Sequence, residues 1–444
     1  MSFERRLKTA LVGDATARFV YIGNFEVERA WARGEPKLPG AGISFANATV
    51  NRMEEMGVLL AGPDDVVLLK EDVDAEFAAY LDRVGAAGGV TLPVGEHDPE
   101  LSVTDDALAS PDALDRLRAL ADGRTYLMPM GVSEAEERLA KATGLPLAGV
   151  PSAVCKAVNG KAYGRRLVES LGLTSIPGAV CETAGELADA VRAHLVDGGK
   201  VVVKESLGVS GRGMVVLDTP EKAERLARMV ARRGADAPVD LVVERWIDKA
   251  ADLNYQFIVS RTGEVAFETV KAAVVAVGVH KGHEFPPELP VHVVPALTAA
   301  ADLIGRELYA AGYFGVVGVD ALLAGDGTLY PCLEINARFN MATYQSRIAE
   351  RFIGPGKHAV AATFGLRLAK KHSFAEVAEA LGDLVFEAEH GVLVNAFATL
   401  NARAEPGGGF PGRIYALCIA DSADAARALR ADAEERLKTM AGDR

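Results

Sequence analysis

The sequence predicts an α/β protein of two or three domains, and three observations support this prediction. The chain has 444 residues, which is too many for a single hydrophobic core. Short apolar runs alternate with helical segments over residues 1–125, a pattern typical of a parallel, Rossmann-like layer. Around residues 200–217 and 319–336, turns that contain glycine join pairs of apolar runs, which indicates antiparallel hairpins.

The composition restricts the class of protein. Hydrophobic residues make up 49% and charged residues 25% of the chain, as in ordinary soluble globular proteins. The net charge of −13 argues against a nucleic-acid partner, because a phosphate backbone requires a broad basic surface. A nucleotide remains compatible with this charge, since its site needs only a few local cations.

Cysteine usage and the lack of a long apolar run predict a cytoplasmic protein. The cysteines lie far apart without a CxxC pair, which favours free thiols over a disulfide framework or a zinc site. They are Cys155, Cys181, Cys332 and Cys418. The first residues lack the apolar run of a signal peptide, and no apolar run has the length of a membrane span, so we expect no membrane partner.

Residues 1–125 contain the capping residues and apolar runs expected of a small α/β layer. A helix over 111–121 has Ser110 as its N-cap, Pro111 at its first position and Gly123 as its stop. Apolar runs predict strands at 18–22, 66–69, 90–93 and, just beyond the layer, 126–130. No G-x-G-x-x-G motif follows the first strand, so we expect no dinucleotide site in this layer.

The stretch from Val319 to Asn340 holds the most specific set of polar residues. The first strand of its predicted hairpin carries Asp320, and the second delivers Glu334, Asn336 and Arg338. The last three are spaced by two residues, so they point to one face of an extended chain. Carboxylate and amide oxygens suit a hard cation such as Mg²⁺, and the guanidinium suits a phosphate or a carboxylate. The alternative is a hairpin with a solvated polar face.

A glycine-rich loop follows the strand that contains Lys204. Gly208, Gly211 and Gly213 lie between this strand and the next one. Such a loop can lay backbone N–H groups over phosphates, because glycine leaves room for a close approach. A flexible hairpin tip has the same composition, so this alternative stays open. The strand at 241–244 leads into a short crossing segment, which suits the edge of an adenine ring.

The second half of the chain mixes strands and helices. Lys271 is followed by His280, Lys281 and His283, and we expect these histidines to lie in a solvated loop. Helices are expected from capping boxes at 133–136 and 183–186 and from sequence patterns at 296–310, 344–351, 358–366 and 423–440. Strands are expected at 255–260, 265–270, 392–398 and 413–420.

Four segments in the middle of the chain together resemble the ATP-grasp carboxylate–amine ligases. They are the helix that begins at Lys161, VVVKESLGVSGRGMVVL, LVVERWIDKAAD and GVD…GTLYPCLEINARFN. They occur in the family's order over about residues 125–365. Within the family, the chain most resembles the pheganomycin-type peptide ligases, through RFVYIGNFE, ARFNMATYQSRIAERFIGPG and AFATLNAR.

The resemblance implies a fold and a division into domains. The fold would be the α+β ATP-grasp fold, with central and C-terminal lobes, behind a Rossmann-like layer that resembles the family's pre-ATP-grasp domain. The implied division is a pre-ATP-grasp domain at 1–125, an ATP-grasp domain at 126–370 with a lid lobe at about 175–245, and a small C-terminal α/β appendage at 371–444.

The resemblance also implies a nucleotide site made of several segments. Two lysines would approach the phosphates, a loop would cover them, two residues would hold the adenine, and an acidic residue would contact the ribose. In that order these are Lys161 and Lys204; Gly208, Ser210, Gly211 and Gly213; Glu244 and Ile247; and Asp252. The family commonly has glutamate where this chain has Asp252, whose side chain is shorter.

The remaining implied residues concern the chemistry. Asp320, Glu334 and Asn336 match the family's ligands for two Mg²⁺ ions that bridge the ATP phosphates. Arg338 matches the arginine that steadies the transferred phosphoryl group or the acyl phosphate. Lys271 follows a strand where some members place a cation near the γ-phosphate.

The implied reaction forms an amide between a small-molecule carboxylate, such as an amino acid, and an amine or peptide. ATP would convert the carboxylate to an acyl phosphate, which the amine then attacks, and natural-product biosynthesis is the expected setting. A homodimer is the default expectation for assembly. Two alternatives remain: a phosphotransferase or primary-metabolic synthetase of the same fold, and a non-catalytic nucleotide-binding sensor or scaffold.

Overall fold

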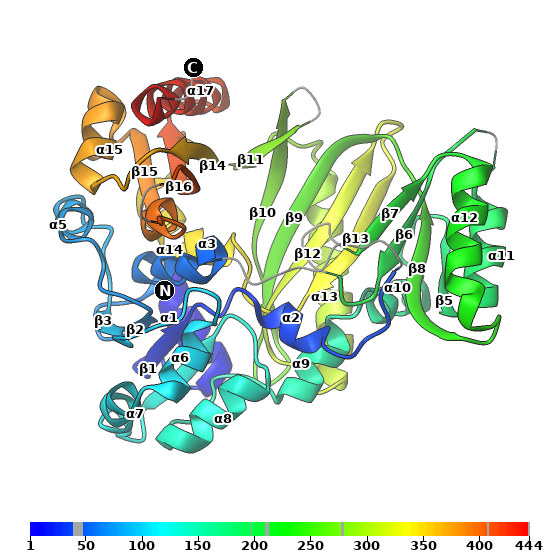
Figure 1. Cartoon of the computed structure of the whole chain (residues 1–444), viewed down its shortest axis with the longest axis horizontal. Coiled ribbons are helices and arrows are strands. Elements are labelled where there is room, and N and C mark those ends of the chain that lie inside the picture. The colour runs from blue at the N-terminus through cyan, green and yellow to red at the C-terminus, as the bar shows by residue number, and fades with distance from the viewer. Residues whose placement is uncertain (39–47, 197, 209–212, 277–278, 406–407, 443–444) are drawn as a thin grey trace.

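The computed structural model describes residues 1–38, 48–196, 198–208, 213–276, 279–405 and 408–442. The strands within these ranges form three β-sheets, and Figure 1 shows the sheet that contains β5–β8 at one end of the long axis. All four cysteines are free, as predicted, and all four are buried. None of the helices in the described ranges combines the length and the apolar character that crossing a membrane requires.

The N-terminal sheet is parallel, which confirms the predicted Rossmann-like layer. Its strand order is β3-β2-β1-β4, with β1 (Arg18–Ile22), β2 (Val66–Leu69), β3 (Val90–Pro93) and β4 (Thr125–Pro129). Ser110 caps α7 as predicted, by accepting a hydrogen bond from the Ala113 N–H. The helices of this part are α1 (Phe3–Val12), α2 (Val27–Trp31), α3 (Ala48–Asn51), η1 (Arg52–Met56), α4 (Gly57–Leu60), α5 (Ala75–Arg83), α6 (Val103–Ala109), α7 (Pro111–Arg118) and α8 (Glu134–Thr143).

A second sheet is antiparallel and has the order β5-β8-β6-β7. It comprises β5 (Gly178–Thr183), β6 (Val201–Glu205), β7 (Met214–Leu217) and β8 (Pro238–Arg245), packed against α11 (Ala184–His194) and α12 (Pro220–Val230), which η2 (Ala231–Arg233) extends. The predicted hairpin is present, with Lys204 of β6 opposite Met214 of β7. The predicted capping box of Thr183 and Glu186 begins α11.

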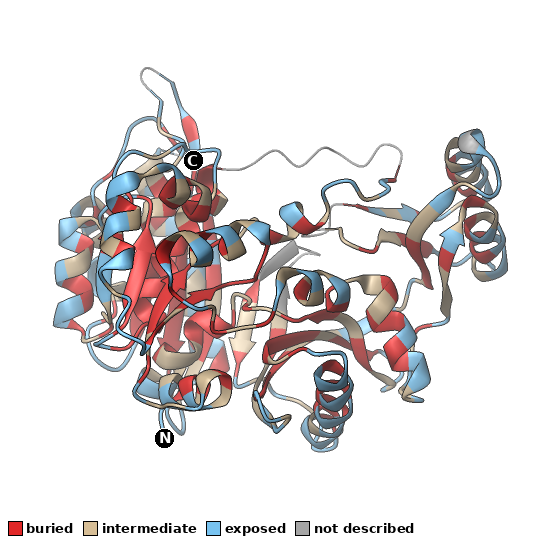
Figure 2. Cartoon of the chain, turned by 90° about the horizontal axis from the view of Figure 1, so that it is seen from below, coloured by how far each residue is buried: buried red, intermediate tan, exposed pale blue. Residues whose placement is uncertain are grey.

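The third sheet is the largest and has the order β13-β12-β9-β10-β11-β14-β16-β15. Its strands are β9 (Lys249–Val259), β10 (Val265–Ala276), β11 (Val279–Phe285), β12 (Gly315–Ala324), β13 (Leu329–Asn336), β14 (His358–Leu368), β15 (Gly391–Ala396) and β16 (Phe410–Ala420). Associated helices are α9 (Ser152–Val158), α10 (Lys161–Ser170), α13 (Val293–Ala310), η3 (Thr343–Gln345), α14 (Ser346–Phe352), α15 (Phe374–Leu381), η4 (Gly382–Leu384), α16 (Ala398–Asn401) and α17 (Ala423–Ala441). Figure 2 shows buried strands covered by helices whose outer faces are exposed.

Two sequence predictions in this sheet are wrong. The helix expected at 358–366 is the strand β14, which lies between β11 and β16 and alternates between buried and more exposed residues from Ala362 onward. Its alanine-rich sequence suggests a helix, but pairing with strands on both sides decides the conformation. The expected solvated loop after Lys271 is the hairpin β10–β11, in which His283 pairs with Ala273. The side chains of His280 and Lys281 lie outside the described residues.

The proposed division at about residues 125 and 370 remains a prediction. The strands that follow residue 370, β15 and β16, continue the same sheet as β9–β14. The C-terminal segment also packs on the N-terminal layer, since the Tyr80 hydroxyl donates a hydrogen bond to the Phe386 carbonyl. Glu55 of η1 makes the same connection, because its carboxylate accepts hydrogen bonds from the N–H groups of Phe397 (2.6 Å) and Ala398 (2.7 Å).

We expect Glu55→Gln to change the pH dependence of stability. Burial raises the pKa of Glu55 to about 7, so the native state keeps a proton that the unfolded chain releases from about pH 4.5 upward. As the pH rises through this window, the wild type therefore loses about 2–3 kcal/mol of unfolding free energy relative to the Gln variant. Urea unfolding at about pH 5 and pH 8 measures the difference. Glu387→Gln, at an exposed carboxylate, is the control, and equal pH dependence in all three proteins would contradict the expectation.

Candidate active site

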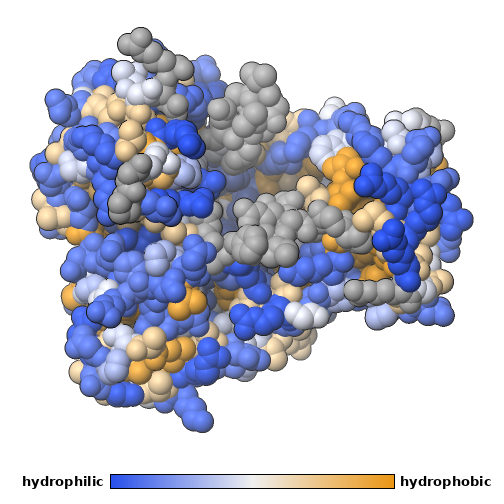
Figure 3. All heavy atoms as spheres, viewed as in Figure 1, coloured by the Kyte–Doolittle hydropathy of each residue, from blue (hydrophilic) through white to orange (hydrophobic). Residues whose placement is uncertain are grey.

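One cavity of about 970 Å³ collects most of the residues predicted for the site. This volume is at the upper end of the range for ligand pockets, roughly 300–1,000 Å³. The predicted residues that line it are Lys161, Lys204, Gly208, Gly213, Asp252, Lys271, Asp320, Glu334, Asn336 and Arg338. Figure 3 shows a mainly hydrophilic face with an apolar patch over the β5–β8 sheet. Met214 of β7 is an exposed apolar residue that also lines the cavity.

The predicted metal ligands lie together on β12 and β13. Asp320 pairs directly with Glu334 across the hairpin, and the Asn336 amide donates a hydrogen bond to Asp320 at 3.2 Å. Asn254, on the neighbouring strand β9, donates to the other oxygen of Asp320 at 2.7 Å. Burial and the nearby Glu334 carboxylate raise the pKa of Asp320 to about 6. Two acidic groups are thus held close together on the cavity wall, where a cation would stabilise both.

This donor set fits a magnesium ion. The described residues contain no group of three or more His, Cys, Asp or Glu side chains placed to hold a metal. Mg²⁺ instead combines one or two carboxylates with substrate phosphates, and Asp320, Glu334 and the Asn336 amide would hold it. The buried Asn254 Oδ1 lacks a hydrogen-bond partner, which leaves one more oxygen beside these carboxylates.

Lys161 connects the glycine loop to the carboxylates. It is the first residue of α10, whose start is fixed by a hydrogen bond from the Lys161 N–H to the Ser206 carbonyl. Its Nζ lies 2.8 Å from Glu334 Oε1 and donates to the Gly208 carbonyl at 2.8 Å. A cation held here by one carboxylate is placed to meet phosphate oxygens in the cavity.

Lys204 is positioned by a buried pair of charges. Its Nζ lies 2.6 Å from Glu244, which is buried and also 3.2 Å from Arg165 of α10. Glu244 and Ile247 are not among the residues that line the cavity, and their contact with adenine stays a prediction. Asp252 lines the cavity and forms an ion pair with Lys249.

The glycine loop is described only at its edges. Gly208 and Gly213 line the cavity, while Ser210 and Gly211 lie outside the described residues. Gly213 has a φ of +75°, and a Cβ there would lie 2.4 Å from a carboxylate oxygen of Glu205. The positive φ therefore favours glycine at this edge of the loop.

Arg338 follows β13 and is oriented by contacts on three sides. Its Nε donates to Glu28 Oε1 at 2.9 Å, and its Nη2 donates both to Glu28 and, at 2.8 Å, to Asn336 Oδ1. Its Nη1 donates to the Phe339 carbonyl at 2.9 Å. Glu28 comes from α2 of the N-terminal part and lines the same cavity, so residues 310 positions apart complete one charged group.

Lys271 lies across the sheet from the predicted metal ligands. The residues Lys271, Asn254, Asp320 and Glu334 are successive cross-strand partners on β10, β9, β12 and β13. The buried Lys271 ammonium donates to Gln345 Oε1 and lies 3.9 Å from the centre of the Phe285 ring. Burial lowers the pKa of Lys271 to about 7, and an anion bound in the cavity would favour its charged form.

Four residues of this site belong to no recognisable motif in their own segments of the sequence. Glu28, Asn254 and Arg165 are described above, and Asn159 is the fourth. The Asn159 side chain donates to the carbonyls of Cys155 and Ala337 and accepts from the Ala337 N–H. It thereby fixes the backbone between Asn336 and Arg338. These residues become recognisable only when the fold brings distant segments together.

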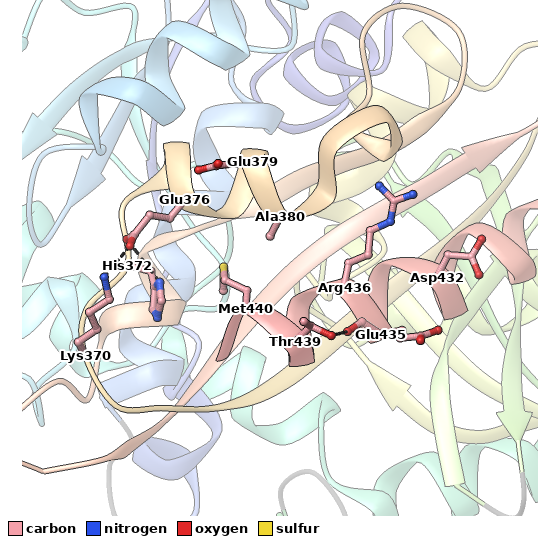
Figure 4. Close-up of a pocket in the computed structure, with 10 residues that line it drawn as sticks. All are labelled: Lys370, His372, Glu376, Glu379, Ala380, Asp432, Glu435, Arg436, Thr439 and Met440. Carbon is pink, nitrogen blue, oxygen red and sulfur yellow. Dashed lines mark hydrogen bonds and ion pairs between the residues drawn. The ribbon is translucent and has the colours of Figure 1, made fainter. Parts of the chain in front are cut away.

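A second cavity lies apart from these residues, between α15 and α17 (Figure 4), and has a volume of about 730 Å³. Two of its cations form ion pairs: Lys370 lies 2.7 Å from Glu376, which also lines the cavity, and Arg436 lies 2.6 Å from Asp383, which does not. None of the predicted site residues lines it, and we assign it no role.

Parts of this chain are similar to known proteins. Residues 53–145 match the family model described as the Pre ATP-grasp domain. The chain is 30% identical over 194 residues to the [Butirosin acyl-carrier protein]–L-glutamate ligase of Niallia circulans, covering 43% of this chain and 46% of that protein. It is 28% identical over 209 residues to the carbamoyl phosphate synthase large chain of Xanthomonas campestris pv. campestris, covering 45% of this chain and 18% of the relative. The chain thus spans less than half the length of these two relatives.

Solved structures show the same fold at low sequence identity. An ADP complex of N5-carboxyaminoimidazole ribonucleotide synthetase superposes with a TM-score of 0.55 and 16% identity, over 88% of this chain and 94% of that chain. Biotin carboxylase from Campylobacter jejuni gives a TM-score of 0.51 and 15% identity, over 93% and 89%. These likenesses, with the parallel N-terminal sheet and the antiparallel sheets that follow it, confirm the predicted ATP-grasp fold. The chain therefore has the ATP-grasp fold, and its residues 53–145 are similar to the pre-ATP-grasp domain.

Proposed function

We propose that this protein is an ATP-dependent ligase that joins the carboxylate of an amino acid or related acid to an amine or peptide. The observation that carries the proposal is the gathering of Asp320, Glu334, Lys161 and Arg338 in one cavity. Paired carboxylates beside fixed cations match the needs of phosphoryl transfer, in which catalysis is mainly positioning and electrostatic stabilisation. A relative named as a glutamate ligase makes L-glutamate the first donor to test.

The proposed reaction has two steps. A carboxylate oxygen of the donor attacks the γ-phosphorus of ATP, and the bond to the bridging oxygen breaks, giving an acyl phosphate and ADP. The amine nitrogen then attacks the acyl carbon, phosphate leaves, and the nitrogen loses a proton. Magnesium, proposed as two ions, would neutralise charge on the phosphates when bound. Lys161, Lys204 and Arg338 would hold the phosphoryl oxygens, and enclosure of the cavity would protect the acyl phosphate from water.

The finer parts of the proposal rest on sequence patterns. RFVYIGNFE, ARFNMATYQSRIAERFIGPG and AFATLNAR support a sub-family of pheganomycin-type peptide ligases and a role in natural-product biosynthesis. The separated, free cysteines support a cytoplasmic location. A homodimer remains the default expectation.

Release of ADP and phosphate from Mg²⁺-ATP tests the proposal. The assay is run with each proteinogenic amino acid, beginning with L-glutamate, with and without a second amino acid or a dipeptide as the amine. We expect release that requires both partners, and a product whose mass equals their sum less water. A stable phosphorylated product without an amide would indicate a phosphotransferase instead. ATP binding without turnover on any pair would indicate a non-catalytic binder.

A further inference from the structure

The cavity extends well beyond the predicted nucleotide and metal residues, onto the C-terminal strands. Thr363 of β14, Asn395 of β15, and Arg413 and Tyr415 of β16 line it together with Asp320 and Glu334. Figure 1 shows β14, β15 and β16 beside β11, on the side of the large sheet away from β12 and β13. We call this part of the cavity the C-terminal end. Its residues match no motif of the family resemblance.

Asn395 is placed in the cavity by a break in strand pairing. Val394 pairs with Ala416 and Ala396 pairs with Tyr415, so Asn395 is the extra residue of a β-bulge. A bulge leaves one residue unpaired and redirects its side chain, and bulges are common beside active sites. The side chain is directed into a buried place, because Asn395 is only 4% exposed.

The Asn395 side chain has a hydrogen-bond acceptor that is not paired. Its Oδ1 is buried and has no hydrogen-bond partner. An unsatisfied buried acceptor destabilises a protein, so its presence in a cavity calls for a ligand that donates. An N–H group of an amine, an ammonium or an amide would satisfy this oxygen.

Arg413, in contrast, is a donor and requires a ligand group that accepts hydrogen bonds. It lies two residues before Tyr415 on β16 and therefore on the same face of the strand, and both line the cavity. Its exposed side chain forms no ion pair or hydrogen bond among the described residues. A guanidinium has a planar set of donors that pairs with both oxygens of a carboxylate.

The charge of the C-terminal end favours an anionic group. The carboxylates that line the cavity come from α2, β9, β12 and β13, whereas the lining residues of β10, β11 and β14–β16 include Lys271, His283 and Arg413 and no Asp or Glu. The two ends of the cavity therefore differ in charge. The lining carboxylates are gathered at one end, together with Lys161, Lys204 and Arg338, whereas the C-terminal end has the cationic Arg413 and no carboxylate.

We propose that the C-terminal end is a recognition subsite for an amino acid or peptide substrate, in which Arg413 pairs with a carboxylate that is not phosphorylated and Asn395 accepts an N–H. The inference rests on the proposed ligase function and specifies its substrate. A carboxylate and an N–H within one molecule are the groups that an amino acid or a peptide end presents. ATP phosphates would instead bind at the end that holds Lys161, Lys204 and Arg338.

The first test compares Arg413→Gln with the wild type. KM values are measured by ADP release for ATP and for each of the two amino acid substrates that give the highest turnover. We expect the KM of one amino acid to rise about 10- to 100-fold, as for loss of a charged hydrogen bond, while the KM of ATP stays within about twofold. Arg367→Gln is the matched control, because Arg367 is an exposed arginine on β14 that does not line the cavity.

A second arm removes the carboxylate from the substrate instead of the guanidinium from the protein. The carboxamide analogue of the affected amino acid should bind the wild type as weakly as the acid binds Arg413→Gln. Combining the variant and the analogue should raise KM little more than either change alone, since each change removes the same interaction. If replacing the acid by the amide raised KM by the same factor in the wild type and in Arg413→Gln, the proposed pairing would be wrong.

The third arm separates recognition from folding at Asn395. Asn395→Leu has a similar size and no acceptor, so it removes the unpaired oxygen from a buried place. We expect the KM of the same amino acid to rise while the thermal unfolding midpoint does not fall. A lower midpoint with an unchanged KM would mean that Asn395 is merely structural.

The outcomes distinguish the subsite from the function on which it depends. No ADP release with any amino acid pair would overturn the ligase and the subsite together. Wild-type ligation with unchanged amino acid KM values in Arg413→Gln would overturn the subsite alone. A rise in the KM of ATP alone would assign Arg413 to the nucleotide and would equally overturn it.

Discussion

Glu334→Gln should abolish amide formation while leaving the fold intact. Glutamine has the same shape but supplies no charge to a cation, and it leaves Lys161 without the carboxylate that lies 2.8 Å away. Weakening a metal-bound transition state by several kcal/mol lowers turnover by about a thousandfold or more. Product mass spectrometry and ADP release measure the loss, and circular dichroism with urea unfolding checks the fold.

Asp326→Asn is the matched control for this prediction. Asp326 lies in the turn of the same hairpin, where its side chain accepts a hydrogen bond from the Thr328 N–H. Asparagine can keep that hydrogen bond, and the position does not line the cavity. Wild-type turnover is therefore expected. If Glu334→Gln retained activity within about tenfold of the wild type, Glu334 would not be a metal ligand.

The hairpin that carries Glu334 could be predicted because its geometry is local. An Asp-Gly turn and the period of two along each strand fix which side chains share a face. The structure places Asp320 opposite Glu334 and connects Asn336 to both Asp320 and Arg338. Helix starts at Ser110 and Thr183 were equally predictable, since a capping side chain bonds to a backbone N–H within three residues.

The contacts that position these groups could not be predicted in this way. Glu28 pairs with Arg338 across 310 positions, and Asn159 holds the Ala337 backbone across 178. Neither residue belongs to a pattern in its own segment. The strand β14 was missed for a related reason: its conformation depends on pairing with β11 and β16, and its own sequence does not encode those partners. Local periodicity therefore predicted elements, whereas tertiary contacts assembled the site.

Arg338→Lys should lower kcat by about a hundredfold to a thousandfold, despite keeping the charge. The guanidinium donates at once to Glu28, Asn336 and the Phe339 carbonyl. A lysine ammonium is a point donor that cannot reproduce this planar set of hydrogen bonds, so its position relative to a transferred phosphoryl group would no longer be fixed. Steady-state kinetics should show a much smaller change in the KM of ATP than in kcat, because Lys161 and Lys204 would still hold the phosphates.

Glu28→Gln tests whether Arg338 acts through this fixed orientation. Glutamine can still accept one hydrogen bond, so we expect a milder loss, of about tenfold in kcat. If Glu28 matters only because it orients Arg338, the double variant should be no slower than Arg338→Lys alone, since the two residues then act as a unit. Fully additive losses would mean that Glu28 contributes independently, for example by contacting the substrate from its place on the cavity wall. The cycle thus determines whether the N-terminal part of the chain takes part in the chemistry or only positions the arginine.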